Sequence, residues 1–380
     1  MNKYFFTFGL AAVLLQACAQ APVQEQQKRQ QIKLPEISTK YQLTDYLTEN
    51  KQLDKDVETI FATLDDTAIV AQLLMPAVGR LGQSEATIKN HIQKRMIGGL
   101  LMLNGTKEGF TKWITDFNAM NASLGNVPFL YSADAEPSLV NRKIIGSHPV
   151  KKANEMKTIQ EVAAYADTIS YDLNAIGINY NFAPVVDMSP NRTVGFRSFG
   201  AIPANIIPWS NTFIQQTQKN GIIATAKHFP GHGLVSGDTH KTLQVIDGEL
   251  KEISNYPKLI EDGVLSVMIG HLAVKNNPKY DTKGLPSTLS RVIVTNLLRE
   301  EMKFNGLIVT DAMNMGGVAA IENCDLKAVE AGCDIVLMPV DAAKAFSDIL
   351  KKYRTDAAFK KQVDASAKRV IRMKVAVGAY

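Results

Sequence analysis

The sequence predicts an α/β fold in which eight strand–helix units close into a single (β/α)8 barrel. Eight short apolar runs alternate along the chain with longer stretches of helical spacing. Most of these runs are apolar on both faces, which is typical of strands in a parallel sheet that helices cover. Polar residues follow the ends of the runs, where a barrel gathers them on one face. A doubly wound open sheet is the alternative, although it would bring fewer of those residues together.

The predicted strands and helices follow one another in a regular order. The eight predicted strands occupy residues 69–75, 97–103, 127–133, 177–183, 222–228, 265–271, 306–312 and 334–340. Helical spacing is clear over 156–175, 202–218 and 289–302, with Ser290 as the candidate N-cap of the last of these. The amphipathic stretch 358–375 is predicted as the helix that closes the barrel. One barrel domain is therefore expected over residues 51–380.

Residues 1–18 are typical of a bacterial export signal. One lysine precedes an apolar run from Tyr4 to Leu15, which is too short to span a bilayer but suits the apolar region of a signal. The tetrapeptide LQAC resembles a bacterial lipobox, and by that resemblance Cys18 becomes the lipidated first residue of the mature protein. Residues 19–50 are then interpreted as a tether, and the domain is expected at the cell envelope, anchored to a membrane through Cys18. An uncleaved signal or a buried first helix is the alternative.

Charge and cysteine content exclude two classes of protein. The net charge of +5 is small and no tract concentrates basic residues, so no nucleic-acid partner is expected. Apart from Cys18 the chain has only Cys324 and Cys333, which do not make a disulfide framework. Cys333 adjoins an apolar run and is predicted to be a buried thiol. Nothing in the sequence indicates an oligomeric state.

Polar and charged residues stand at or just after the ends of five consecutive predicted strands. In chain order they are Asp134 and Glu136, then Asp187 and Arg197, then the histidine-rich loop 227–240, then His271, and finally Asp311. The carboxyl ends of barrel strands meet on one face, where barrel enzymes build their active sites. These side chains are therefore expected to share one site.

The loop KHFPGHGLVSGDTH, residues 227–240, carries three of the six histidines. His228 and His232 are four residues apart, a spacing that would aim both at one metal ion if the segment were helical. Proline and glycine residues between and beside them disfavour a helix. A metal wrapped by this loop with Asp238 and His240 stays open as an alternative, although no Cys-x-x-Cys or His-Glu-x-x-His motif accompanies it. We expect no metal and no cofactor.

Asp238 and His240 form a candidate proton-transfer pair. In an extended segment residues i and i+2 point to the same side, so the carboxylate can accept a hydrogen bond from one imidazole nitrogen and leave the other free to exchange a proton. Asp311 ends an apolar strand, where an acidic residue is costly unless it is paired or functional. A surface pair on a turn and a helix N-cap are the respective alternatives. An acid and a nucleophilic carboxylate on one face are the minimum for retaining glycoside hydrolysis.

Several motifs in a fixed order resemble family 3 of the glycoside hydrolases, specifically its β-N-acetylhexosaminidase branch. The resemblance runs from about residue 65 to the end of the chain, and the motifs that carry it are NYNFAPVVD, RSFG, KHFPGHG with DTH, GLIVTDAMNMGGV and AGCDIVLMP. It implies that Asp311 is the catalytic nucleophile and that His240 is the general acid/base, oriented by Asp238. It also implies that the sugar is contacted by Asp134, Arg142, Arg197, Lys227 and His228.

The segment DAEPSLVNR, residues 134–142, departs from the pattern of that family. Pro137 and Ser138 replace two glycines, and Leu139 replaces an arginine. A proline fixes φ and removes a backbone donor, so the loop beside the distal hydroxyls of the sugar is expected to differ here. Glu136 is interpreted as structural.

The resemblance implies a retaining exo-β-N-acetylglucosaminidase that releases terminal N-acetylglucosamine from β-linked glycans, with peptidoglycan fragments as the expected substrate. A histidine acid/base carries no permanent negative charge when it acts as base, so phosphate is a conceivable acceptor beside water. Three rivals remain: a non-catalytic binding protein for wall glycans, a zinc hydrolase, and a β-glucosidase of the same family. Members of that last kind usually draw their acid from an additional domain, which this chain is not expected to contain.

Overall fold

The computed structural model describes residues 34–380. The predicted signal, Cys18 and the first part of the predicted tether lie outside the described residues. No helix among the described residues is long and apolar enough to cross a membrane.

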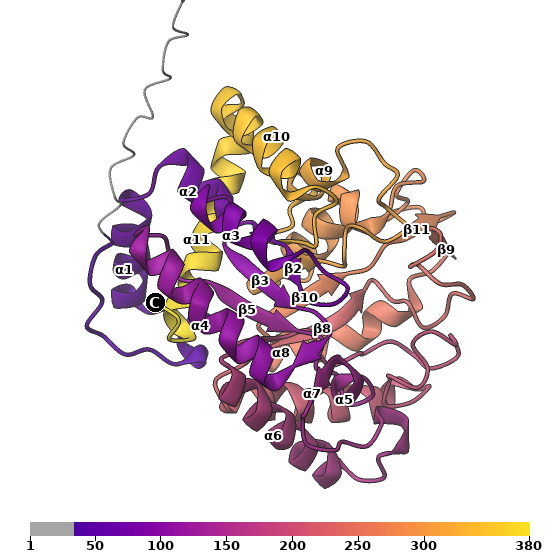
Figure 1. The fold of residues 1–380 in the computed structure, drawn as a ribbon. Helices are drawn as coiled ribbons and strands as arrows, with labels where there is room; N and C mark the ends of the chain where they lie inside the picture. The colour runs from indigo at the N-terminus through magenta and orange to yellow at the C-terminus, as the bar shows by residue number, and fades with distance from the viewer. Residues whose placement is uncertain (1–33) are drawn as a thin grey trace, which may run out of the picture. The chain divides into compact units, whose positions relative to one another are not determined.

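Nine short strands form the wall of an eight-stranded parallel barrel (Figure 1). They are β1 (Leu74–Met75), β2 (Ala77–Val78), β3 (Gly99–Met102), β5 (Leu130–Ala133), β7 (Tyr180–Asn181), β8 (Ile223–Phe229), β10 (Ser266–Ile269), β12 (Leu307–Thr310) and β13 (Val336–Leu337). Seven of them form one sheet in the order β12-β10-β8-β7-β5-β3-β2. Every neighbouring pair in that sheet is parallel.

Pro76 divides the first barrel strand into β1 and β2, because proline has no backbone N–H to donate to a neighbouring strand. On one side of it β2 pairs with β3, and on the other β1 pairs with β13. A bridge between Val309 of β12 and Ile335, next to β13, joins the last two strands. The ring therefore closes, and the predicted (β/α)8 barrel is confirmed.

Six of the eight predicted strand segments contain the whole observed strand, the fifth ends one residue before β8 does, and the first is partly wrong. Residues 66–71 form helix α2 (Asp66–Ala71), whose N-cap Asp65 accepts a hydrogen bond from the amide of Ala68 at 2.8 Å. The strand starts only at Leu74. A short run that is apolar on all sides does not distinguish a buried helix from a buried strand, and this N-cap decides in favour of the helix.

Helices cover the outside of the barrel. They are α1 (Lys51–Ala62), α3 (Glu85–Gln93), α4 (Lys107–Ser123), α5 (Val140–Lys143), α6 (Ile159–Ile176), α7 (Pro203–Lys219), α8 (Tyr256–Glu261), η5 (Val292–Glu301), α9 (Cys324–Ala331), α10 (Ala342–Thr355) and α11 (Ala357–Ala376). The π-helix η5 begins at Val292, and Arg291 before it already has helical backbone angles. Ser290 has an extended backbone and its carbonyl accepts from the amides of Ile293 and Val294, so the helical hydrogen bonds start at the predicted residue.

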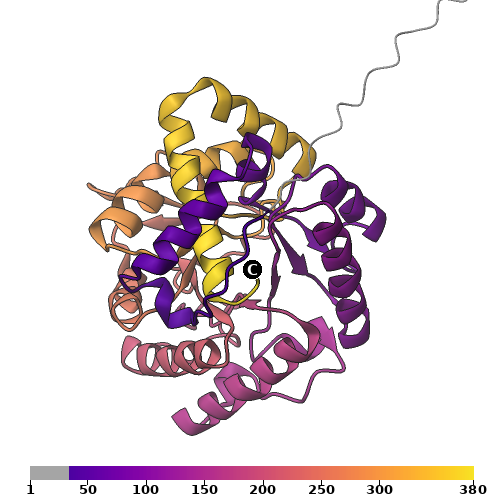
Figure 2. The same cartoon turned by 90° about the vertical axis from the view of Figure 1, so that its left-hand side faces the viewer.

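The folded domain begins before residue 51, where the predicted tether was expected to end. Residues 43–46 form the 3-10 helix η1 (Leu43–Tyr46), in which Leu43 and Tyr46 are buried. The Tyr46 hydroxyl donates to the carbonyl of Asn305, just before β12, so this segment covers the amino ends of the strands. Figure 2 shows α1 and α11 side by side over the same end. The guanidinium group of Arg372, on α11, also donates to the carbonyls of Asp45, Tyr46 and Thr48 and so helps to hold the segment in place.

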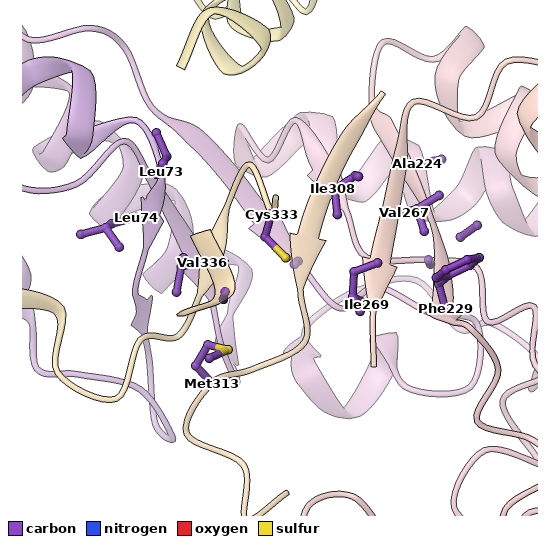
Figure 3. Close-up of a cluster of buried hydrophobic side chains, with 14 of the residues drawn as sticks. Leu73, Leu74, Ala224, Phe229, Val267, Ile269, Ile308, Met313, Cys333 and Val336 are labelled. Atoms are coloured by element: carbon purple, nitrogen blue, oxygen red, sulfur yellow. The ribbon is translucent and has the colours of Figure 1, made fainter. Parts of the chain in front are cut away.

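The core lies between the strands and their covering helices. Figure 3 shows part of it, where side chains from successive strands meet: Leu74, Phe229, Val267, Ile269, Ile308 and Val336. All are fully or almost fully buried, and each contributes roughly 1.5–3 kcal/mol of transfer free energy. Cys333 belongs to this cluster, as predicted, and it and Cys324 are free buried thiols.

Candidate active site

All eight residues predicted to act on or bind a substrate line one cleft at the carboxyl ends of the barrel strands. The cleft has a volume of about 810 Å³, and its walls include Asp134, Arg142, Arg197, Lys227, His228, Asp238, His240 and Asp311. Lys227 and His228 belong to β8 itself, Arg142 lies on α5, and the others come from the segments that follow β5, β7, β8 and β12. The barrel thus brings together side chains that are up to 177 positions apart, from Asp134 to Asp311.

Asp311 follows the last residue of β12, and its backbone is held on two sides. Its amide donates to the carbonyl of Ile269 at the end of β10, at 2.8 Å. The amide of Ala312 donates to the Asp311 Oδ1 atom at 2.8 Å, and the carbonyl of Ala312 accepts from Nε2 of His271 at 2.9 Å. His271 thereby supports the turn that carries Asp311. Thr288 fixes the ring through its hydroxyl, 2.9 Å from Nδ1.

The surroundings of Asp311 keep its carboxyl group ionised. Burial opposes ionisation, but the imidazoles of His228 and His271 and the amide of Ala312 outweigh it, so the pKa of Asp311 is lowered. His240, which lines the same cleft, also lowers it. An ionised carboxylate in a cleft is a competent nucleophile.

The predicted Asp238–His240 pair is present. Nδ1 of His240 lies 2.9 Å from Oδ1 of Asp238, which also accepts the His240 amide at 3.0 Å. Because an ionised carboxylate can only accept, Nδ1 carries the proton and Nε2 is left free. The His240 side chain is 61% exposed. Burial raises the pKa of Asp238, but the two hydrogen bonds from His240 outweigh this and lower it.

The glycines of the histidine-rich loop are needed because its backbone passes very close to neighbouring groups. A Cβ on Gly233 would lie 1.9 Å from the carbonyl oxygen of Met188, and one on Gly231 would lie 2.4 Å from Cβ of Glu252. Glu252, in η3 (Lys251–Asn255), accepts backbone hydrogen bonds from Met188, Gly233 and Leu234 at 2.6–3.2 Å. Sequence reasoning missed Glu252, because no motif distinguishes this buried carboxylate from the other acidic residues of the chain.

His228 and His232 of the loop each contact a neighbouring protein group. Nδ1 of His228 donates to Oδ2 of Asp187 at 2.7 Å, and Nε2 of His232 lies 3.2 Å from the hydroxyl of Thr239. Burial lowers the pKa of His232 to about 4, so it is neutral at physiological pH. Within residues 34–380 no three His, Cys, Asp or Glu side chains are grouped as metal ligands.

A buried charge network forms the floor of the cleft. The ammonium group of Lys227, only 2% exposed, lies 2.6 Å from Oε1 of Glu136 and 3.0 Å from Oδ1 of Asp134. Arg197 binds Glu136 with two parallel hydrogen bonds of 2.7 Å. Burial raises the pKa of Glu136, but Arg197 and Lys227 outweigh it and lower the pKa to about 2. Glu136 therefore acts as the shared anion between two cations, in line with its predicted structural part.

Lys143 is a site residue that sequence reasoning missed. Its Nζ atom donates to Oδ2 of Asp134 at 2.6 Å, so Asp134 is held by a lysine at each oxygen. Arg142 lines the cleft but is exposed, and it has no side-chain hydrogen bond or ion pair among the described residues. The motif used for the prediction ends at Arg142, so it gave no reason to consider the next residue on α5.

The altered segment 134–142 is built into the site wall. The Ser138 hydroxyl donates to the carbonyl of Phe196 at 2.7 Å and accepts the amide of Ala153 at 2.9 Å. Leu139, which stands where an arginine was expected, is buried. Ser138 thus ties this segment to the loop that carries Arg197, a contact that glycine in its place lacks.

Comparisons with known proteins agree on one family. Residues 63–373 match the model of the Glycosyl hydrolase family 3 N terminal domain. A protein named Beta-hexosaminidase from Hydrogenovibrio crunogenus is 32% identical over 211 residues, which are 52% of this chain and 58% of that protein. Beta-hexosaminidase LpqI of Mycobacterium tuberculosis is 31% identical over 329 residues, which are 80% of this chain and 81% of that protein.

A solved structure shares the fold of the described domain. The glycoside hydrolase family 3 beta-N-acetylglucosaminidase from Paenibacillus sp. str. FPU-7 superposes with a TM-score of 0.76 at 27% identity. The match covers 83% of this chain and 63% of that one. The chain therefore spans less than two thirds of the length of this structure and of the Hydrogenovibrio relative.

Proposed function

The chain belongs to glycosyl hydrolase family 3, and from that premise we propose that it is a retaining exo-β-N-acetylglucosaminidase. The observation that carries the proposal is one cleft that holds both an ionised Asp311 and the Asp238–His240 pair. The names of its relatives support the choice of sugar, since they include β-hexosaminidases and a β-N-acetylglucosaminidase.

The proposed reaction has two steps. Asp311 attacks the anomeric carbon while Nε2–H of His240 protonates the leaving glycosidic oxygen, which gives a glycosyl-enzyme and a free aglycone. Neutral His240 then takes a proton from water as the water displaces Asp311, so the anomeric configuration is retained. Asp238 accepts the Nδ1–H hydrogen bond throughout, and its charge stabilises the imidazolium form of His240 that donates in the first step and is restored in the second.

The remaining cleft residues are proposed to hold the sugar. Hydroxyl groups both donate and accept hydrogen bonds, so they suit a floor on which carboxylates alternate with cations. The proposed sugar contacts are Asp134, Arg142, Arg197, Lys227 and His228, all of which line the cleft. Lys143 joins them as a partner of Asp134.

An assay of aryl glycosides tests the proposal and separates it from two rivals. The protein is expected to cleave 4-methylumbelliferyl N-acetyl-β-glucosaminide with a higher kcat/KM than the corresponding glucoside. Asp311→Asn keeps the size of the side chain but removes its charge, and should lower kcat by about 10⁴-fold or more. Cleavage of neither glycoside by the unaltered protein would instead favour a non-catalytic glycan-binding role, and preference for the glucoside would favour a β-glucosidase.

Phosphate is proposed as a second acceptor for the glycosyl-enzyme. Neutral His240 repels an anion less than a carboxylate base would. Turnover of the aryl glycoside in phosphate buffer should then yield N-acetylglucosamine 1-phosphate beside the free sugar. Finding free sugar alone at every phosphate concentration would restrict the acceptor to water.

The location and natural substrate are proposed from the N-terminal sequence. A lipid on Cys18 would hold the domain at the cell envelope, where peptidoglycan fragments bearing terminal N-acetylglucosamine are available. Metabolic labelling with a fatty-acid analogue should mark the full chain but not the Cys18→Ala variant. Release of N-acetylglucosamine from purified muropeptides tests the substrate, and failure to release it while aryl glycosides are cleaved would point to another glycan.

A further inference from the structure

The loop that carries the Asp238–His240 pair rests directly on a pair of glycines in the loop that carries Asp311. The amide of Gly316 donates to the carbonyl of His240 at 3.0 Å, and the amide of Gly317 donates to the carbonyl of Thr239 at 3.1 Å. The two loops follow different strands, β8 and β12. Their backbones are therefore joined at the residues that flank the proposed acid/base.

Close approach at this junction depends on the missing side chain of Gly316. A Cβ there would lie 2.3 Å from the carbonyl oxygen of Lys241 and 2.9 Å from that of His240, both shorter than real Cβ contacts. A Cβ on Gly317 would lie 3.1 Å from the Thr239 carbonyl, which is tight but within reach of a small adjustment. The two glycines thus differ in how much a methyl group would displace the opposite loop.

Thr239 is held from its other side by a buried histidine. Its hydroxyl lies 3.2 Å from Nε2 of His232, and Thr239 and His232 are only 3% and 4% exposed. Thr239 stands between Asp238 and His240 in the sequence, so fixing it fixes the backbone of both. Its side chain contacts His232, and its carbonyl group accepts a hydrogen bond from Gly317.

The His240 ring has little else to position it. In the described part of the chain, the one side-chain partner of the ring is Asp238, which lies on the same loop and moves with it. The His240 side chain is mostly exposed. Its place relative to Asp311 is consequently decided by the backbone at residues 239–241.

We propose that Gly316, Gly317 and the Thr239–His232 contact form a clamp that positions His240 for proton transfer to the leaving group. These four are positioning residues, since they act through His240. The clamp rests on the proposed function and adds to it the reason why two glycines follow the nucleophile at this spacing. Because Gly316 lies five residues beyond Asp311, the clamp links the acid directly to the segment that bears the nucleophile.

The test compares two N-acetyl-β-glucosaminides with the same sugar and different leaving groups. A 2,4-dinitrophenyl group departs without protonation, whereas 4-methoxyphenyl needs the acid. The ratio of the two kcat/KM values therefore reports on the acid, because kcat/KM follows the first chemical step. A merely structural change in the barrel would lower both values alike and leave the ratio unchanged.

Gly316→Ala is expected to lower kcat/KM for the methoxyphenyl substrate on the order of 10-fold or more beyond its loss on the dinitrophenyl substrate. Gly317→Ala should shift the ratio in the same direction by less. His240→Ala is the reference for complete loss of the acid. If both glycine variants lower kcat/KM equally for the two substrates, the clamp is ruled out.

A second pair of variants tests the clamp even if Gly316→Ala does not fold. Thr239→Val keeps the shape and removes the hydroxyl group, while Thr239→Ser keeps the hydroxyl group. The valine variant should show an altered ratio of the two kcat/KM values, and the serine variant should show the ratio of the unaltered protein. The melting temperatures of both variants should be close to that of the unaltered protein. The same kcat/KM ratio in the valine and serine variants would overturn the proposal. An unaltered protein that cleaves neither substrate would refute the proposed function instead.

Discussion

Lys227 organises the charges of the candidate site at the scale of single residues. Its buried ammonium group bridges Asp134 and Glu136, and each of those carboxylates has a second cationic partner. Removing a charge from water costs several kcal/mol, so each member of the network is tolerated because the others are present. The network therefore fixes the position of the Asp134 carboxylate and the Arg197 guanidinium in the cleft without any contact from a substrate.

Glu136→Gln tests this network at its most buried member. The substitution removes a negative charge that Lys227 and Arg197 share, and leaves two cations facing an uncharged amide. We expect the free energy of unfolding to fall by about 3 kcal/mol, measured by urea denaturation. Glu155→Gln is the control, because Glu155 is an exposed partner of Lys152 and should change nothing measurable. A neutral effect of Glu136→Gln would mean that the network is not a structural unit.

At this scale the sequence predicted where the charged residues gather but not how they pair. Asp134, Arg197 and Lys227 were placed on one face by their positions after strands, and the barrel puts them there. The bidentate Arg197–Glu136 contact and the part of Lys143 depend on side-chain directions over distances of 9 to 61 residues, which no local pattern encodes.

At the scale of elements, the histidine-rich loop is held by backbone contacts to its neighbours and has little regular structure of its own. Asn191 shows this: its side chain donates to the carbonyls of Val235 and Gly237, and its amide donates to the carbonyl of Gly233. Such contacts need glycines where the two backbones meet, which explains the glycine content of the loop. The loop is thus one wall of the cleft and its shape depends on the loop after β7.

Gly233→Ala is expected to displace that wall. Its methyl group would have to occupy space 1.9 Å from the Met188 carbonyl, so one of the two backbones must move. We expect a loss of about 2 kcal/mol in the free energy of unfolding together with a fall in kcat/KM on both aryl substrates. Gly109→Ala, in the first turn of α4, provides a control, since a methyl group there meets only the Thr106 hydroxyl at 3.2 Å. Equal stability of the two variants would show that the loop is free to shift.

The boundaries of an element were predicted well where its hydrophobic periodicity extends over many residues. They were predicted poorly where the periodic segment is short. The 18 residues of α6 and the 20 of α11 lie close to their predicted limits. The start of the first barrel strand and the docking of η1 were missed. The first depends on the short helix α2, whose cap at Asp65 outweighs an ambiguous apolar run. The second depends on partners that are distant in sequence, such as Tyr46 and Asn305.

At the scale of the whole molecule, the barrel separates the cleft from a buried lysine near the opposite end. Lys374 of α11 is 0% exposed, and its ammonium group donates to Oε1 of Gln72 at 2.6 Å. No acidic side chain pairs with it among the described residues. Burial alone lowers its pKa from 10.5 to about 7, so above about pH 7 the folded protein favours the neutral amine.

Lys374→Met should stabilise the protein in a pH-dependent way. Between about pH 7 and 10.5 the unfolded chain binds a proton at this lysine that the folded chain does not, so the stability of the unaltered protein rises with pH in that window by up to about 1.4 kcal/mol per pH unit. The methionine variant lacks this dependence, and its advantage should shrink between pH 7.5 and 9.5 in urea titrations. Lys361→Met, on the exposed face of the same helix, should show the same pH dependence of the free energy of unfolding as the unaltered protein. Parallel curves for both variants would contradict the neutral state of Lys374.

The proposed mechanism requires Asp311 to form a covalent bond to the sugar in the cleft that it shares with His240. Trapping the enzyme with a mechanism-based fluorosugar related to N-acetylglucosamine, followed by mass-spectrometric mapping of the labelled peptide, tests it most directly. We expect one sugar per chain, attached to Asp311 in the peptide that continues into the MNMGG turn. A label on any other residue, or full inactivation of aryl-glycoside turnover with no covalent adduct, would contradict it.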